Sequence, residues 1–259
     1  MSRRLVARVE GANPLKFLHA MLSQDVESLA PGSGALACLL DDKGRIEAEL
    51  RVLALGDGTV LLDGPPASNV ERLVRTAPLS GCEVRDESEA WTLTSTTAID
   101  VPGPEHAHVD VDEGIAVRVE WGGVRTDVLH RAPAAVAPLD PGAAERARIE
   151  DGRVMLGIDV EPGTLVNETP LLARAVSFTK GCYPGQESVA RVRNLGRARR
   201  RFCLLEGEVA PGPVRVNDEE IGRVTSASGD LALAVVEAGT EEGAAVATAA
   251  GNARVRALL

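Results

Sequence analysis

The amino-acid sequence predicts an α+β fold that ends in a small antiparallel β-barrel. Up to Thr96, strand-like and helix-like patterns alternate in an order typical of a sheet covered on one face by helices. After Arg201, short apolar runs follow one another at regular spacing, which is typical of a small barrel. The chain has 259 residues, of which 44% are hydrophobic, and this is enough for several small units that fold without disulfides.

The first elements are a strand, a helix and a hairpin. Residues 3–9 alternate as a strand does, and Pro14 begins a helix at its first turn, where the missing N–H of proline does no harm. Residues 35–40 form an apolar run that predicts a buried strand. The Asp41–Gly44 segment is a hairpin signal, and the chain returns through residues 46–55.

The next elements extend this module. The sequence predicts a strand at residues 59–63, a helix around residues 67–76, and strands near 83–86 and 91–96. Residues 100–114 contain two prolines and several acids, so they are predicted to be a surface linker.

His106 and His108 fall in this linker. A His-x-His pair can bind a metal ion, but a pair in a proline-rich loop is usually solvated, and we predict no metal site. The four cysteines are far apart and form no Cys-x-x-Cys pair. This favours reduced thiols over a disulfide framework, and it argues against a cluster held by this chain alone.

The middle of the chain continues with two strands and a helix. Residues 115–121 and 124–131 are predicted strands, joined by a tight turn at Gly122–Gly123. After a linker from Pro133, a helix begins near Pro141. Residues 160–179 form a long, partly irregular arm.

The formal net charge of −10 repels phosphate backbones and anionic membranes on average. One segment departs from this average, because six arginines lie between Arg191 and Arg201: Arg191, Arg193, Arg197, Arg199, Arg200 and Arg201. This cluster is either a solvated surface or a weak contact for an anion or tRNA. No apolar stretch reaches the length of a signal peptide or a membrane span, so we predict a cytoplasmic protein without a membrane partner.

The most informative stretch is KGCYPGQE, residues 180–187. It places a thiol, Cys182, and the only tyrosine of the chain, Tyr183, in a turn between Gly181 and Gly185. The glycines allow positive φ and close approach of another backbone or a ligand, and the proline fixes its own φ. Glu187 then begins a short helix, with its carboxylate at the positive end of the helix dipole.

This stretch resembles the KGCYxGQE signature of the YgfZ-type proteins, tetrahydrofolate-binding relatives of the glycine-cleavage T-protein that support iron-sulfur enzymes. The matching residues are Lys180, Gly181, Cys182, Tyr183, Gly185, Gln186 and Glu187. The opening of the chain and the run from Arg148 to Asp159 are also similar to the T-protein family. The resemblance implies a GcvT-like fold, with two ferredoxin-like α/β units around a central folate pocket and a C-terminal barrel.

The implied units are a folate-binding α+β unit made of residues 1–55 and 132–200, a second ferredoxin-like unit at 56–131, and a barrel at 201–259. The implied cofactor is tetrahydrofolate or a derivative. The implied partners are iron-sulfur assembly proteins or client iron-sulfur enzymes, including enzymes that modify tRNA.

The resemblance also implies site residues. Cys182 is the expected functional thiol, and its alternative is a buried small hydrophobe. Asp127 matches the acid that anchors the pterin ring, and its alternative is an edge-strand acid that faces water. Glu150 and Arg148 are expected ligand contacts, although a pair at a helix end can simply bond the backbone.

The transferases of this family carry two aspartates on the strand after the hairpin, and the first of them positions the reacting nitrogen of folate. Ala48 and Glu49 stand at these positions here. Alanine cannot act as a base, and alternation along the strand turns Glu49 to the opposite face, so we expect Glu49 to be a poor replacement. The sequence also lacks the familiar catalytic motifs. Binding is therefore favoured, with a folate-dependent aminomethyltransferase or demethylase as the alternative.

Overall fold

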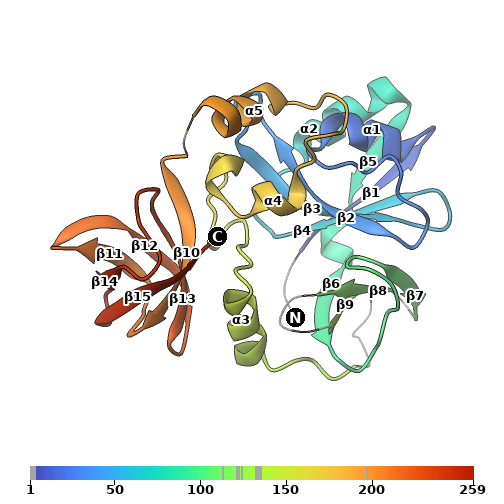
Figure 1. Ribbon diagram of the computed structural model, residues 1–259. Coiled ribbons are helices and arrows are strands. Elements are labelled where there is room, and N and C mark those ends of the chain that lie inside the picture. The colour runs from blue at the N-terminus through green and yellow to red at the C-terminus, as the bar shows by residue number, and fades with distance from the viewer. Residues whose placement is uncertain (1–3, 113, 121–122, 124, 132–135, 197) are drawn as a thin grey trace.

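The computed structural model describes residues 4–112, 114–120, 123, 125–131, 136–196 and 198–259. Parts of several predicted features therefore lie outside the described residues, namely Trp121, Gly122, Val124, Pro133 and Arg197. Figure 1 shows two sheets, an arm with short helices, and a barrel at the C-terminal end. None of the helices among the described residues is long and apolar enough to cross a membrane.

The first sheet is antiparallel, in the order β2-β3-β4-β1-β5. Its strands are β1 (Leu5–Gly11), β2 (Gly34–Leu40), β3 (Ile46–Ala54), β4 (Val60–Gly64) and β5 (Cys82–Asp86). Helices α1 (Pro14–Met21) and α2 (Glu71–Thr76) cover one face through a core that includes Phe17, Leu73 and Ala48. Helix α2 begins four residues later than predicted, because the Ser68 hydroxyl bonds the backbone of Glu49 on β3 and the Asn69 side chain caps the N–H of Glu71.

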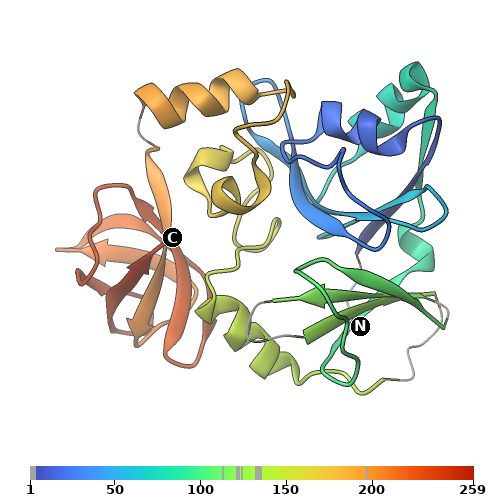
Figure 2. The same cartoon turned by 45° about the vertical axis from the view of Figure 1, so that its right-hand side comes forward.

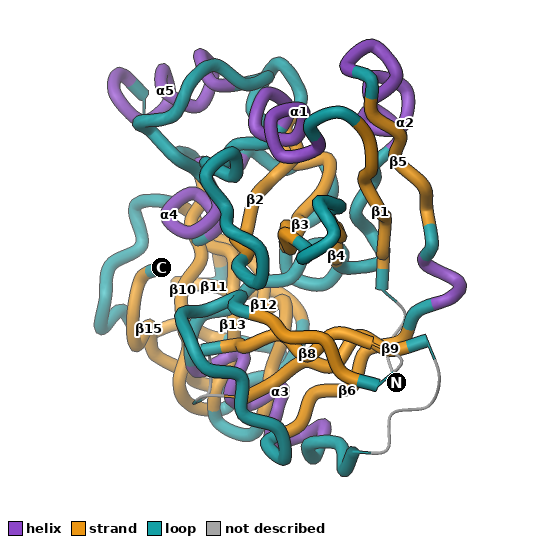
Figure 3. The backbone as a smooth tube through the Cα atoms, turned by 90° about the vertical axis from the view of Figure 1, so that its right-hand side faces the viewer, coloured by secondary structure: helices purple, strands orange, loops and turns teal. Residues whose placement is uncertain are grey.

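The second sheet lies across the other face of the first (Figure 3). It is antiparallel, in the order β6-β9-β8-β7, and its strands are β6 (Thr92–Thr96), β7 (His108–Val111), β8 (Gly114–Val119) and β9 (Arg125–His130). Apolar side chains of the two sheets, including Leu53, Leu61, Ile115 and Leu129, form a common core. This packing covers only part of the first sheet and leaves room for a pocket beside it.

The predicted linker at residues 100–114 is wrong in part, because it contains β7. His106 and His108 are buried, and the Nε2 atom of His108 lies 3.0 Å from the backbone oxygen of Ala54 on the first sheet. The strand has only four residues and follows two prolines, so the alternation that would reveal it is too short to detect.

An arm connects the sheets to the barrel. It starts with α3 (Pro141–Glu150), continues through a 3-10 turn (Val166–Glu168) and α4 (Leu171–Ala175), and ends with α5 (Gln186–Leu195). Its apolar side chains pack against Cys38, Leu40 and Ile46 of the first sheet. Figure 2 shows α3 between the second sheet and the barrel, and α3 indeed contacts β12 and β13.

The predicted C-terminal barrel is confirmed. Six strands close in the order β10-β13-β12-β11-β14-β15 around their own apolar core. They are β10 (Arg200–Gly207), β11 (Gly212–Val216), β12 (Glu219–Ser228), β13 (Leu231–Glu237), β14 (Ala245–Ala247) and β15 (Asn252–Leu258).

The sheets and the predicted unit boundaries do not all coincide. The boundary after residue 55 falls between β3 and β4, which are hydrogen-bonded neighbours in the first sheet. Residues 60–86 therefore complete that sheet, and the second sheet is formed by residues 92–130. The boundary after residue 200 falls at the start of β10.

Candidate functional site

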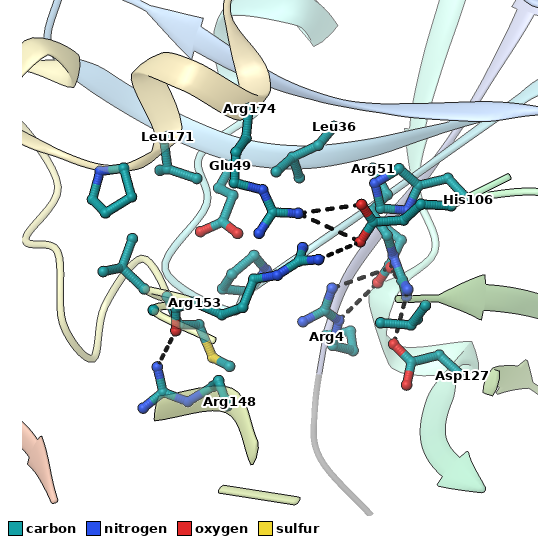
Figure 4. Close-up of a pocket in the computed structure, with 18 residues that line it drawn as sticks. Arg4, Leu36, Glu49, Arg51, His106, Asp127, Arg148, Arg153, Leu171 and Arg174 are labelled. Carbon is teal, nitrogen blue, oxygen red and sulfur yellow. Dashed lines mark hydrogen bonds and ion pairs between the residues drawn. The ribbon is translucent and has the colours of Figure 1, made fainter. Parts of the chain in front are cut away.

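A polar pocket opens beside the second sheet, against the face of the first sheet that α1 and α2 leave uncovered (Figure 4). The first sheet contributes Glu49 and Arg51, the second sheet contributes Asp127, and the arm contributes Arg153 and Arg174. The cavity itself measures about 100 Å³, and its mouth opens to solvent. Charged side chains from several elements converge on it, which is typical of a site that binds a polar ligand.

A buried network of charges forms one wall of the pocket. The Asp63 carboxylate accepts hydrogen bonds from the Nε atoms of Arg4 at 2.7 Å and Arg51 at 2.5 Å. Arg51 also donates from Nη1 to Asp127 at 2.8 Å. Burial opposes ionisation of Asp63, but the two guanidinium charges hold its pKa below the usual range. The network therefore keeps this wall ionised and rigid.

Asp127 lies on β9, between β6 and β8, and its side chain is buried and lines the pocket. Its Oδ1 atom accepts from the Ser95 hydroxyl at 2.6 Å, and its Oδ2 atom accepts from Arg51. The interpretation as an edge-strand acid facing water is therefore wrong. A carboxylate has about four acceptor sites, so Asp127 can still accept a hydrogen bond from a ligand.

Glu49 lines the pocket, although it was expected to be a poor replacement for the aspartate of the transferases. Ala48 and Glu49 do face opposite sides of β3, as alternation predicts, but the pocket lies on the side of Glu49. Its Oε2 atom accepts the backbone N–H of Leu156 at 3.0 Å, and no described donor bonds its Oε1 atom. Burial raises the pKa of Glu49 above the ordinary value. The alternation of Glu49 and Arg51 along β3 is the sequence signal that could have revealed it.

Arg148 lies at the edge of the pocket, but its N–H groups bond the protein. It donates from Nε and Nη2 to Glu145 at 2.8 and 2.7 Å, and from Nη1 to Asp159 at 2.6 Å and to the Arg153 carbonyl at 2.5 Å. A further bond from Nη2 reaches the Ser226 hydroxyl at 2.8 Å. An arginine has five N–H donors, and all of them are used. Arg148 therefore joins α3, the arm and the barrel.

Glu150 lies at the last position of α3, where its side chain is exposed. It is not among the described residues that line the pocket. The buried carboxylate of this part of the chain is Asp159, which accepts hydrogen bonds from Arg148 and from the hydroxyls of Thr225 and Ser226. Of the expected ligand contacts, Asp127 therefore lines the pocket, Arg148 lies at its edge, and Glu150 lies outside it.

The signature turn is built into the end of helix α1. The Lys180 ammonium donates to the carbonyls of His19, of Leu22 at 2.6 Å and of Gln24 at 3.2 Å, which have no partner within the helix. Burial lowers the pKa of Lys180 to about 8. The buried ring of Tyr183 lies beneath this ammonium, 5.2 Å from the nitrogen to the ring centre. Both residues therefore support the turn.

Gly185 fixes the turn against the β2–β3 hairpin. Its φ is 84°, and a Cβ atom there would lie 2.4 Å from the backbone oxygen of Asp41. Only glycine fits this backbone at such a close approach. Helix α5 then begins at Gln186, with Glu187 in its first turn, and the Ser188 hydroxyl donates to the carbonyl of Asp42 at 2.9 Å.

Cys182 is exposed at the surface of this turn, whereas Cys38, Cys82 and Cys203 are buried. The buried-hydrophobe interpretation therefore does not hold for Cys182. It is not among the described residues that line the pocket, so the thiol and the pocket are separate sites. Within the described ranges, no group of three or more His, Cys, Asp or Glu side chains is arranged to hold a metal ion.

Comparisons with known proteins agree with these features, although no family model matches the chain. It is 27% identical over 236 residues to the tRNA-modifying protein YgfZ of Serratia proteamaculans, covering 82% of this chain and 72% of the relative. It is 25% identical over 234 residues to the YgfZ of Yersinia pestis strain Pestoides F, covering 81% of this chain and 71% of that protein. The resemblance to YgfZ-type proteins is confirmed.

The fold of this chain is GcvT-like. The crystal structure of the glycine cleavage system aminomethyltransferase T from Bartonella henselae superposes on it with a TM-score of 0.79. The alignment covers 99% of this chain and 83% of the transferase, at 18% sequence identity. This likeness concerns the fold alone.

Proposed function

We propose that this protein binds tetrahydrofolate, or a derivative of it, in the central pocket and supports the assembly or repair of iron-sulfur clusters in client enzymes. Enzymes that modify tRNA are the clients that the names of the YgfZ relatives suggest. The observation that carries the proposal is a polar pocket, in a GcvT-like fold, to which two strands bring the carboxylates of Glu49 and Asp127.

The pterin ring of folate presents an N–H and an amino group side by side, and a carboxylate can accept from both. Asp127 is the anchor that the family resemblance implies, but Arg51 and Ser95 already occupy one position on each of its oxygens. Glu49 keeps one oxygen without a described donor. Glu49 is thus a second acid for the pterin ring, and Asp127 closes the opposite wall of the pocket.

One feature favours the alternative of folate-dependent one-carbon transfer. A carboxyl group that lines a pocket and has a raised pKa can exchange protons near the reacting atoms of a ligand, and Glu49 has both properties. A transferase would move a methylene group from an amine donor to tetrahydrofolate. Formation of methylene-tetrahydrofolate that depends on Glu49 would support this activity, and its absence would leave the pocket as a binding site.

Cys182 is the proposed thiol that acts on other proteins, because it is exposed and lies outside the pocket. Cys182→Ser is therefore expected to abolish support of an iron-sulfur client enzyme while the affinity for folate stays within about threefold, since the two sites share no described residue. Gly181→Ala is the matched control, because a Cβ atom at Gly181 meets no atom within 4 Å. Full client activity with the serine variant would remove the thiol from the mechanism.

A groove between α4, α5 and the barrel supports the proposed weak contact with an anion or tRNA. It contains Arg193, Arg200 and Arg201, and none of the three forms an ion pair with a described residue. The Arg193 guanidinium stacks 3.8 Å above the ring of Phe178, and Glu168 is the acid among the described residues that line the groove. Arginines and an exposed ring together suit single-stranded RNA.

Filter binding of tRNA over a range of salt concentrations tests this contact. Replacing both Arg200 and Arg201 with glutamine should lower the salt slope of log K by about 0.7 for each lost contact with a single-stranded phosphate backbone. The exposed pair Arg254 and Arg256 on β15 is the control. An unchanged slope in the groove variant would exclude the contact.

A further inference from the structure

One acidic residue at the pocket is shared by two cations. Glu105 accepts from the Nη2 atom of Arg153 at 2.7 Å and lies 3.3 Å from the Nη2 atom of Arg174. Arg153 belongs to the arm, and Arg174 belongs to α4. All three side chains are partly open to solvent, with exposed fractions of 25%, 16% and 28% for Glu105, Arg153 and Arg174. The two guanidinium groups and one carboxylate leave an excess positive charge here.

The other cations of the pocket do not share this excess. Arg4 and Arg51 face the two carboxylates of Asp63 and Asp127. Arg148 faces Asp159 and Glu145. Arg153 and Arg174 are therefore the two pocket arginines that share a single carboxylate among the described residues, and a second carboxylate placed between them would balance their charge.

The loop that carries Glu105 is held in a costly conformation. His106, the next residue, has a φ of 70°, which is uncommon and strained for a residue with a side chain. Its ring is buried, and its Nδ1 atom has no hydrogen-bond partner among the described residues. The loop is fixed from both sides, because Val101 and Ala107 pack together and the backbone N–H of Arg118 donates to the carbonyl of Ala107. A strained and fixed loop thus presents the Glu105 carboxylate to the two arginines.

The contacts of the two arginines with Glu105 are unequal. Arg153 makes a short ion pair, but both oxygens of Glu105 are 3.3 to 3.4 Å from Arg174. The Arg174 side chain has no other hydrogen-bond or ion-pair partner in the part of the chain that the structure describes. Its remaining N–H groups are therefore available, in the fork geometry that binds a carboxylate through two parallel hydrogen bonds.

We propose that Arg153 and Arg174 form a carboxylate subsite that receives the glutamate tail of the bound folate, and that Glu105 is the resident carboxylate that this tail displaces. The proposal rests on the function proposed above, because it names the part of the folate that this end of the pocket recognises. A tail carboxylate supplies the negative charge that the two arginines lack. Glu105 then competes with the ligand and lowers its affinity.

The test compares two ligands by calorimetric titration: tetrahydrofolate and tetrahydropteroate, which has the same rings but no glutamate. The unsubstituted protein should bind tetrahydrofolate about tenfold more tightly, as expected for a charge-assisted contact. Arg174→Gln should remove this difference and leave the affinity for tetrahydropteroate unchanged. Glu105→Gln should increase the affinity for tetrahydrofolate alone, because the competing carboxylate is gone.

The control is Arg85→Gln, which breaks an Arg–Glu pair of 2.7 Å on the surface of β5, away from the pocket, and should change neither affinity. Equal affinities of the unsubstituted protein for the two ligands would overturn the subsite and leave the folate proposal intact. So would an equal loss for both ligands in the Arg174 variant, because the arginine would then support the fold of the pocket. Binding of neither ligand to the unsubstituted protein would overturn the proposed function and the subsite together.

Discussion

Replacing Glu49 with glutamine should weaken folate binding without harming the fold. Glutamine has nearly the same shape, and its side-chain oxygen can still accept the N–H of Leu156. The lost feature is the charge offered to the pterin ring, worth about 1.5 to 3 kcal/mol for a charge-assisted hydrogen bond. The dissociation constant should therefore rise roughly 10- to 150-fold.

Stability should change in the opposite direction. The pKa of Glu49 is raised by burial, so the folded protein favours the neutral acid, and the ionised form at neutral pH destabilises the fold. The stability that the neutral acid contributes is lost as the pH rises through the folded pKa. Glu49→Gln should then unfold at a higher temperature than the unsubstituted protein at neutral pH. Weaker binding by a more stable protein could not be explained by misfolding.

The pH dependence of binding provides a third check. As the pH falls through the raised pKa of Glu49, the unsubstituted protein should lose affinity for folate, and this loss should begin at a higher pH than for a glutamate with an ordinary pKa. The affinity of the glutamine variant should not change over the same pH range. The assay is calorimetric titration with tetrahydrofolate between neutral and mildly acidic pH. Glu47→Gln is the control, because Glu47 lies two residues earlier on β3 and pairs with Arg72 outside the pocket. Equal dissociation constants for the Glu49 variant and the unsubstituted protein would refute the reasoning.

Two further predictions concern stability. Gly185→Ala should destabilise the fold by about 2 kcal/mol or more in chemical denaturation, because the φ of Gly185 is positive and a Cβ atom there would collide with the Asp41 carbonyl. Gly181→Ala should change the stability little. Equal stability of the two variants would contradict this account of the turn. Burial and the charge of Arg51 lower the pKa of His106 from 6.5 to about 4, so the folded protein keeps the imidazole neutral. The stability that the neutral imidazole contributes is complete above the ordinary pKa. Roughly 3 kcal/mol of it is lost as the pH falls through the folded pKa. His106→Asn, which tolerates the left-handed backbone, should remove that loss, and an acid-unfolding curve identical to that of the unsubstituted protein would show that another group titrates.

Features that depend on neighbours in sequence were predictable. The strands of the barrel follow one another at regular spacing, so alternation and turns were enough to indicate them, although β10 pairs with the distant strands β13 and β15. The signature turn was also predictable, because glycine permits a positive φ and proline fixes its own φ. Of the two glycines expected to allow a positive φ, Gly185 has one and Gly181 does not.

Features that depend on packing between distant parts of the chain could not be predicted. Alternation showed that Ala48 and Glu49 face opposite sides of β3, but which side borders the pocket depends on where the second sheet and the arm pack. Arg148 could not be assigned for a similar reason, because its partner Ser226 lies in the barrel, far along the chain. Glu105 looked like one acid in a proline-rich linker, although the fold places it against Arg174.

The central claim is that the pocket between the sheets and the arm binds a reduced folate. Titration of the unsubstituted protein with tetrahydrofolate in a calorimeter measures this directly. We predict saturable binding of one molecule per chain, with a heat that Glu49→Gln reduces and Cys182→Ser leaves intact. A titration of the unsubstituted protein that shows no saturable heat with tetrahydrofolate or its 5-formyl derivative would contradict the account.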